Sequence, residues 1–204
     1  MALAKTNKNA VKADKRKALI DAAIEVFAEK GYSNTVVAEV AAVANVAAGT
    51  VYLYFENKED LLYQAMQEMM RETLFKLKKK IAKEERAVDK LFQLIVKHVE
   101  FFTKDPNLAR FLVLELRQSK EFYNRYPNFN PYADYLEYVQ SLIKQSIEDK
   151  TTLPYDPVSL SFLLIGVMDM MLTQWVINPE KINLPKITDE VKQILNYGMG
   201  PGQI

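Results

Sequence analysis

The chain has 204 residues, of which 49% are hydrophobic and 26% charged, and its formal net charge is only +1. This composition excludes an intrinsically disordered or collagen-like chain, and the length suffices for one large or two small domains with a buried core. There is no cysteine and a single histidine, His98. These counts exclude a disulfide framework, a Cys-ligated zinc or iron–sulfur site and a multi-histidine metal site.

The N-terminal segment 1–17 is rich in Lys and Ala. Its six basic residues against one acidic residue, Asp14, give a local charge of +5. The segment lacks the apolar region of a signal peptide. The most apolar stretch, 160–176, is slightly short for a membrane span and carries Asp169 in its middle, so we interpret it as a buried core helix. We therefore expect a soluble, cytoplasmic protein that does not contact a membrane.

Helix signals run along the whole chain, and strand signals are nearly absent. The first amphipathic helix is predicted to end at Gly31, a residue type that commonly terminates helices. Two short helices are predicted at 34–42 and 47–54. They are joined by a tight turn at Asn45, because asparagine tolerates the left-handed backbone conformation. Together these helices form a small N-terminal unit.

The C-terminal part begins with a long helix predicted over 57–83, capped by Asn57 with Asp60 three residues later. A second apolar stripe runs from Leu91 to Phe102. Later helices are predicted to begin where a capping side chain precedes a proline, namely at Asp105-Pro106, Asn130-Pro131 and Asp156-Pro157. The apolar helix 157–177 is predicted to end at Asn178-Pro179, a last helix covers about 188–197, and the tail 198–204 is expected to be disordered.

These elements predict an all-α protein of about nine helices. We expect an N-terminal three-helix, helix-turn-helix domain with its basic arm over 1–56, and a C-terminal helical bundle for ligand binding and dimerisation over 57–204. The apolar character of 157–177 all round its axis suggests burial on two sides, against the core and against a cavity or a partner chain.

The helices at 34–42 and 47–54 have the spacing of a helix-turn-helix, whose second helix lies in the DNA major groove. Small residues at the start of that helix, Ala48 and Gly49, let the backbone approach DNA closely. Val51, Leu53 and Phe55 are assigned to the inward face, and the basic segment 5–17 fits a minor-groove or backbone contact. Side chains expected to reach DNA are Thr50, Tyr52, Tyr54 and Lys58. Ordinary helix packing is the alternative for the two tyrosines, and a solvated lysine is the alternative for Lys58.

The run GTVYLYFENKEDLL at 49–62 closely resembles the signature of the TetR family of transcriptional regulators, and 27–35 and Val40-Ala41 also resemble that family. The resemblance implies a DNA-binding domain, a ligand-binding and dimerisation domain, and repression of an operator that a small molecule relieves. It also implies a phosphate contact at Thr35. Polar residues of the family are replaced here at Val36, Ala38 and Ala48, so we expect specificity from thymine methyl contacts, the arm and DNA shape.

The segment 97–119 resembles the TetR subgroup that controls fatty-acid degradation and senses long-chain acyl-CoA, and the pattern Gly166…Asp169…173–178 resembles the same subgroup. An apolar pocket between helices fits such a ligand and is favoured for the region as a whole, although each apolar residue taken alone is more often bundle core. The candidate cations for binding the CoA head group are Arg110, Arg117, Lys120 and Arg125. The predicted ligand-site residues are His98, Phe102, Phe111, Glu115, Arg117, Phe162, Ile165, Gly166, Asp169 and Met170.

Four of these residues have open roles. Asp169 cannot stay charged and unpaired in an apolar helix, so it needs a partner such as Arg110 or Arg117, or a hydrogen bond into the pocket. Glu115 poses the same question, and His98 is either a hydrogen-bonded core residue or a ligand contact. Gly166 in mid-helix suggests close approach of a ligand or of a partner helix.

The preferred function is a dimeric repressor of fatty-acid metabolism genes that binds a palindromic operator and is released by acyl-CoA. The alternative is a TetR-type repressor of a multidrug efflux or other transport operon that senses lipophilic drugs, for which Glu115, Asp169 and Trp175 supply acidic and aromatic groups. An enzyme is excluded because the chain has no Gly-rich phosphate loop and no paired-carboxylate signature. A helical interaction protein without DNA is the remaining class. No cofactor or metal is expected.

Overall fold

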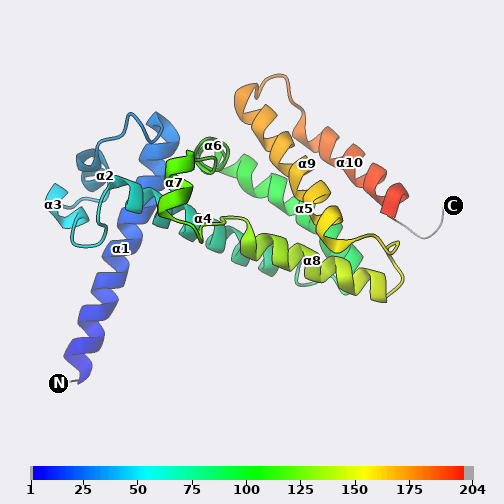
Figure 1. Cartoon of the computed structure of the whole chain (residues 1–204), viewed down its shortest axis with the longest axis horizontal. Helices are drawn as coiled ribbons and strands as arrows, with labels where there is room; N and C mark the ends of the chain where they lie inside the picture. Colours follow the sequence, from blue (N-terminus) through cyan, green and yellow to red (C-terminus); the bar gives the residue numbers. More distant parts are fainter. Residues whose placement is uncertain (1, 200–204) are drawn as a thin grey trace.

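The computed structural model describes residues 2–199, with side chains from Val11 onward, and has no strand within them. Figure 1 shows α1–α3 at one end of an elongated molecule and α5 and α8–α10 at the other. The helices are α1 (Ala2–Lys30), α2 (Val37–Val43), α3 (Ala48–Val51), α4 (Lys58–Ile81), α5 (Ala87–Lys104), α6 (Pro106–Glu115), α7 (Lys120–Arg125), α8 (Ala133–Glu148), α9 (Pro157–Ile177) and α10 (Leu184–Met199).

In the N-terminal unit α2 packs against α1, and α3 packs against α2. Gly31 ends α1 with φ of +76°, and Asn45 makes the turn between α2 and α3 with φ of +54°. Both residue types adopt this left-handed conformation more easily than others, so the two predicted breaks are confirmed. The small core between the helices consists of Leu19, Ile20, Ala23, Phe27, Val37, Val40, Val51 and Phe55.

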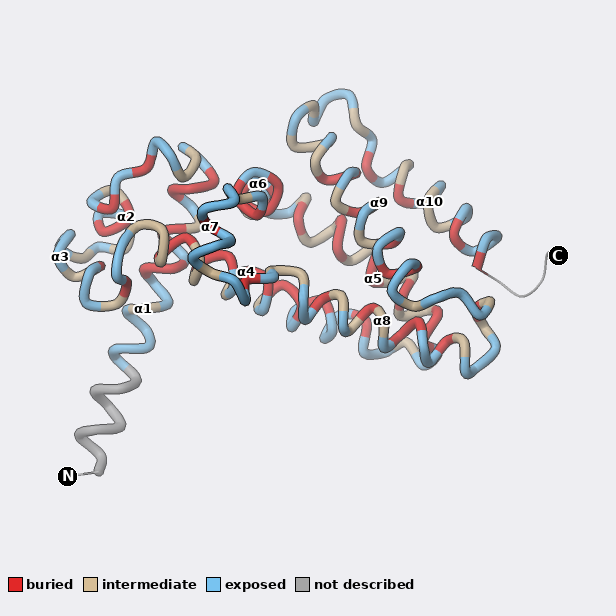
Figure 2. The backbone as a smooth tube through the Cα atoms, viewed as in Figure 1, coloured by how far each residue is buried: buried red, intermediate tan, exposed pale blue. Residues whose placement is uncertain are grey.

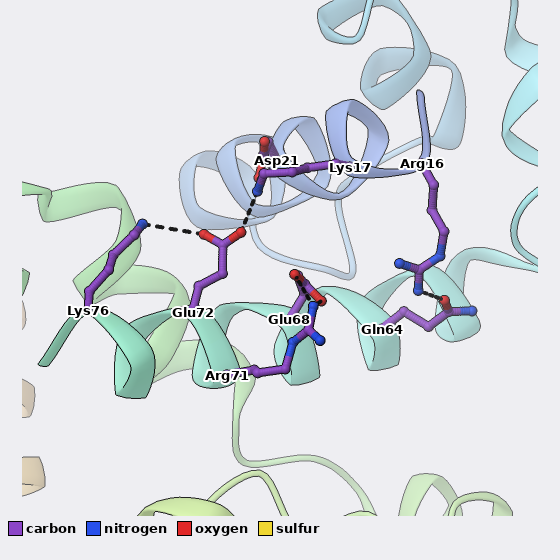
Figure 3. A network of polar contacts seen from close by, with 8 residues as sticks. All are labelled: Arg16, Lys17, Asp21, Gln64, Glu68, Arg71, Glu72 and Lys76. Carbon is purple, nitrogen blue, oxygen red and sulfur yellow. Dashed lines mark hydrogen bonds and ion pairs between the residues drawn. The ribbon is translucent and has the colours of Figure 1, made fainter. Parts of the chain in front are cut away.

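Helix α4 connects the two ends of the molecule, packing against α1 near its start and against α5 and α8 further along. As predicted, the Asn57 side chain accepts a hydrogen bond from the Asp60 backbone N–H, at 2.9 Å. Figure 3 shows the polar network that joins α1 to α4, in which Lys17 bridges Asp21 and Glu72, and Arg16 donates to Gln64. The orientation of α1 is therefore fixed to α4 by polar contacts as well as by core packing.

The C-terminal part is a bundle of α5, α8, α9 and α10, with α6 packed between α1 and α9. Asp105 and Asp156 cap α6 and α9 as predicted, each before a proline. Figure 2 shows that burial follows one face of each of these helices. Helix α9 has the length and composition of a membrane span, but its inner face is buried and its outer face is apolar and exposed. The prediction of a buried core helix therefore holds for one face only.

Several predicted boundaries differ from the structure. The described residues form ten helices because Ser119 caps an additional short helix, α7, by accepting from the Phe122 N–H. Asn130-Pro131 does not start a helix: the Asn130 side chain accepts from the Tyr132 N–H, and α8 begins only at Ala133. The basic segment expected to act as an arm is helical from Ala2 as a continuation of α1. Residues 200–204 of the expected disordered tail lie outside the described residues, whereas Gly198 and Met199 belong to α10.

Candidate functional site

The outer surface of the α2–α3 unit is formed by small and hydroxyl-bearing residues. Ala48 and Gly49 are exposed at the start of α3, Tyr52 is 57% exposed, and Thr50 and Tyr54 are half-buried. Four of the predicted DNA-contacting side chains and Gly49 therefore lie together at one end of the molecule. A Cβ built at Gly49 would meet no atom within 4 Å, so the backbone there is open to a close approach.

The assignment of Leu53 to the inward face is wrong, because its side chain is 75% exposed. Helix α3 ends at Val51, and the chain then turns. The helical period on which the assignment rested is lost after that residue. Val36 and Val43, at 61% and 49%, are two further exposed apolar side chains of this unit. Exposed apolar groups here agree with the expectation that this surface has little polar base-reading chemistry.

Thr35 and Lys58 have partners inside the protein. Thr35 is 2% exposed and its Oγ1 donates to the Gly31 carbonyl at 2.9 Å. The Lys58 ammonium donates to the carbonyls of Tyr32 and Thr35 at 2.7 and 2.9 Å, and lies 4.4 Å from the Tyr32 ring centroid. In this arrangement both side chains hold the loop before α2, and neither presents a free polar group to DNA.

The second candidate site is a cavity lined by residues of α4, α5, α6, α8 and α9, which we call the central cavity. It encloses about 20 Å³, close to the space of a single water molecule. The structure brings four predicted ligand-site residues to it, His98, Phe102, Ile165 and Asp169. Sequence reasoning missed its other lining residues, which are Met70, Thr73, Leu112, Tyr132, Tyr135 and Met168. Nothing in the sequence separates these residues from ordinary core positions.

Polar groups in this cavity are paired with one another. His98 Nδ1 and the Tyr135 hydroxyl are hydrogen-bonded at 3.0 Å. Burial lowers the pKa of His98 to about 4, so the imidazole is neutral at neutral pH. The Tyr132 hydroxyl donates to Asp169 at 3.3 Å, and Arg117 forms an ion pair with the same carboxylate. Asp169 thus has an intrachain partner of the predicted kind, and Arg117 contacts the cavity wall through this ion pair.

The remaining predicted ligand-site residues lie elsewhere. Phe111 is buried between α6 and α1, where its ring stacks on Phe27. Glu115 accepts a hydrogen bond from the Tyr32 backbone N–H at 3.0 Å, so it joins α6 to the loop after α1. Burial raises the pKa of this carboxyl group. Three more lie on the outer face of α9, which is exposed in the protomer: Phe162, Gly166 and Met170.

The neutral state of His98 makes stability pH-dependent. An unfolded histidine has a pKa of about 6.5. Between this value and about 4, the unfolded chain binds a proton that the folded chain does not. The free energy of unfolding therefore keeps the full contribution of this group above about pH 6.5. As the pH falls toward 4, the free energy of unfolding decreases by up to about 3 kcal/mol because of this group.

Because His98 is the only histidine, one imidazole proton resonance reports its titration directly by NMR. We expect the resonance to show a neutral ring at pH 5. A midpoint near 6.5 would contradict the buried, neutral imidazole. A variant with His98→Phe should lose this part of the pH dependence in denaturant unfolding, while the part due to carboxylates remains.

Comparisons with known proteins agree with this geometry. Residues 19–65 match the family described as bacterial regulatory proteins, tetR family, and residues 66–198 match the C-terminal region of YsiA-like proteins. The fatty acid metabolism regulator protein of Bacillus subtilis is 35% identical over 182 residues, which cover 89% of this chain and 93% of that protein.

Solved structures give the same result. The B. subtilis regulator FadR in complex with stearoyl-CoA superposes with a TM-score of 0.80 at 33% identity, covering 89% of this chain and 98% of that one. The fatty acid degradation regulator FadR from Bacillus halodurans superposes with a TM-score of 0.80 at 32% identity, with the same coverage. The chain therefore belongs to the TetR family and is a transcriptional regulator rather than an enzyme.

Proposed function

We propose that this protein represses genes of fatty-acid metabolism by binding a palindromic operator as a homodimer, and that long-chain acyl-CoA releases it. The observation that carries this proposal is that one helix, α4, contributes residues both to the central cavity and to the contacts that hold the DNA-binding unit. Met70 and Thr73 of α4 line the central cavity, and Lys58 at the start of α4 holds the loop before α2. The related B. subtilis regulator, whose structure contains stearoyl-CoA, supports the choice of effector.

DNA contact is assigned to the exposed end of the α2–α3 unit. The backbone at Ala48 and Gly49 would approach the major groove, and Thr50, Tyr52 and Tyr54 would supply hydroxyl groups. Leu53 joins this set as an apolar contact, such as one to a thymine methyl group. Thr35 and Lys58 become positioning residues, because their polar atoms bind the loop before α2.

Dimerisation is assigned to α9 and α10. Their outer faces expose apolar side chains that a protomer alone leaves in water: Val158, Phe162, Leu163, Met170, Ile177, Ile194 and Tyr197. Many exposed apolar side chains on two neighbouring helices favour an interface. In a two-fold symmetric dimer the two α3 helices would meet successive major grooves about 34 Å apart.

Coupling between the two sites is assigned to α4 and to the end of α6. Glu115 connects α6 to the Tyr32 backbone, and Arg117, two residues later, pairs with Asp169 of the cavity wall. An acyl chain enters the cavity only when the surrounding helices separate, because the enclosed space is about 20 Å³. That separation would displace the groups that hold the DNA-binding unit.

The efflux alternative receives less support from the same contacts. A cationic drug needs a free carboxylate, but Asp169 is paired with Arg117 and Tyr132, and Glu115 is bonded to Tyr32. We retain the division of the chain at 56/57 as a prediction, with the qualification that α4 serves both parts. A regulator that binds operator DNA works in the cytoplasm, which is the location we propose.

Titration of dodecanoyl- to octadecanoyl-CoA against the protein–operator complex tests the proposal. Changing a two-state population from 1:99 to 99:1 takes about 5.5 kcal/mol of differential affinity, and each buried methylene contributes roughly 0.8 kcal/mol. We therefore expect release in fluorescence anisotropy at concentrations that fall steeply with chain length. Free CoA is the control and should not release DNA. Failure of every acyl-CoA to release the operator, or release by a lipophilic cationic dye instead, would reject this effector.

A further inference from the structure

Two open grooves border the central cavity, and they differ in charge. The first lies among α1, α4, α5 and α6 and shares Thr73 with the cavity wall. Lys76 is its one basic lining residue, against five carboxylates: Asp21, Glu25, Glu68, Glu72 and Asp105. A ligand with several phosphate groups would be repelled there.

The second groove runs between α4 and α8. Its inner part, of about 530 Å³, shares Met70 and Tyr135 with the cavity, so these two side chains form the wall between them. Its outer part, of about 500 Å³, shares Arg71, Leu74 and Asp134 with the inner part. The two parts therefore form one path, the α4–α8 groove, from the cavity wall to the protein surface.

The outer part of the α4–α8 groove combines cations with aromatic rings. Arg71 and Lys78 line it from α4, and the Lys78 ammonium lies 4.2 Å from the ring centroid of Tyr138 on α8. Phe75 also lines it and is 59% exposed, an unusual position for a phenylalanine in water. Lys79 and Lys80 follow on the exposed surface of α4.

The opposite wall of the outer part is acidic, with Asp134 and Glu137 on α8. The groove is therefore not a simple cationic patch. These three kinds of group match the parts of a nucleotide. Its phosphates accept hydrogen bonds from the cations, its amino and ribose hydroxyl groups donate hydrogen bonds to the carboxylates, and its base stacks on the aromatic rings.

We propose that the α4–α8 groove binds the nucleotide head of an acyl-CoA whose acyl chain occupies the central cavity. This inference rests on the proposed function. Arg71 and Lys78 bind phosphate groups, the adenine stacks on Phe75, and its amino group or the ribose hydroxyls donate to Asp134 or Glu137. The thioester arm lies in the inner part, past Met70, whose flexible side chain can move aside.

The cations suggested by the sequence fit this role less well. Arg117 is paired with Asp169, and Arg125 with Glu59. None of the four cations suggested by the sequence, these two or Arg110 and Lys120, lines the α4–α8 groove. Arg71 is also paired, with Glu68, but it lines the groove. Lys78 lines the groove as well and forms no ion pair in the described part of the chain.

The test compares two ligands with the same acyl chain. Dodecanoyl-CoA carries the nucleotide, and the dodecanoyl thioester of N-acetylcysteamine lacks it. For the double variant Arg71→Gln/Lys78→Gln, we expect the affinity for dodecanoyl-CoA to fall at least tenfold by calorimetry, with the affinity for the short thioester unchanged. Phe75→Ala, at an exposed position, should give a severalfold loss with dodecanoyl-CoA alone. Lys181→Gln, in the loop between α9 and α10, is the matched control and should change neither affinity.

The outcomes separate this inference from the proposed function. If the wild type releases its operator with dodecanoyl-CoA but the double variant binds it as tightly as the wild type does, the head group lies elsewhere and the function stands. Equal losses for both ligands would also overturn the inference, because they would indicate damage to the cavity. If the wild type binds no acyl-CoA, both proposals fail.

Discussion

Replacement of Gly49 by glutamate is expected to abolish operator binding while the protein stays folded and dimeric. Gly49 is exposed at the start of α3, its φ is not positive, and a Cβ there meets no atom within 4 Å, so the side chain can be added without strain. In the proposed complex the new carboxylate would face the phosphate backbone at close range. Like-charge contacts of this kind cost several kcal/mol, so we expect affinity to fall roughly 100-fold or more.

The measurement is operator affinity by fluorescence anisotropy at two salt concentrations, with circular dichroism to check the fold. Gln145→Glu, which adds the same charge on the exposed surface of α8, is the matched control and should bind DNA normally. Normal operator affinity in the Gly49→Glu variant would show that the start of α3 does not face DNA.

A second large effect is expected at Gly166, on the exposed face of α9. Within the protomer a Cβ at this position meets no atom within 4 Å, so nothing in the protomer requires a glycine. Phe162 and Met170, one turn before and after it, are 59% and 55% exposed. These features are explained if the same face of a second copy lies against the glycine, where the missing side chain allows close approach.

Gly166→Glu should therefore convert the dimer to a monomer. Each copy would place a charge in the centre of an apolar two-fold interface, and buried charges without partners are strongly destabilising. Sedimentation velocity measures the change in mass, and operator affinity should fall together with the dimer because both half-sites are needed. The Gln145→Glu variant serves again as control. A dimeric Gly166→Glu variant, or a monomeric wild type, would remove α9 from the proposed interface.

The elements were predictable where a local sequence rule decides them. Gly31 and Asn45 end helices because of their backbone freedom, and Asp105 and Asp156 begin helices because each caps one before a proline. The short helix α7 was missed because six residues carry too little periodicity to stand out. Asn130-Pro131 has the same pattern as the successful pairs, but its side chain is used in a turn.

The candidate sites were less predictable, because residue type does not reveal which side of an element faces a ligand. Thr35 and Lys58 have the chemistry of phosphate contacts, yet their partners are carbonyl groups of the neighbouring loop. Helix α9 is apolar all round, so periodicity could not separate Ile165, which lines the cavity, from Phe162, which faces outward. The role of Glu115 depends on Tyr32, 83 residues away in the chain, a contact that only the tertiary fold creates.

The Lys58 ammonium has a consequence for the thermodynamics of DNA recognition. By donating to two carbonyl groups of the loop before α2, it holds that loop in one conformation before any DNA arrives. The entropy of ordering the loop is then lost during folding and not during association. Binding should accordingly proceed as the docking of a preorganised surface, with a heat-capacity change no larger than the buried contact area accounts for.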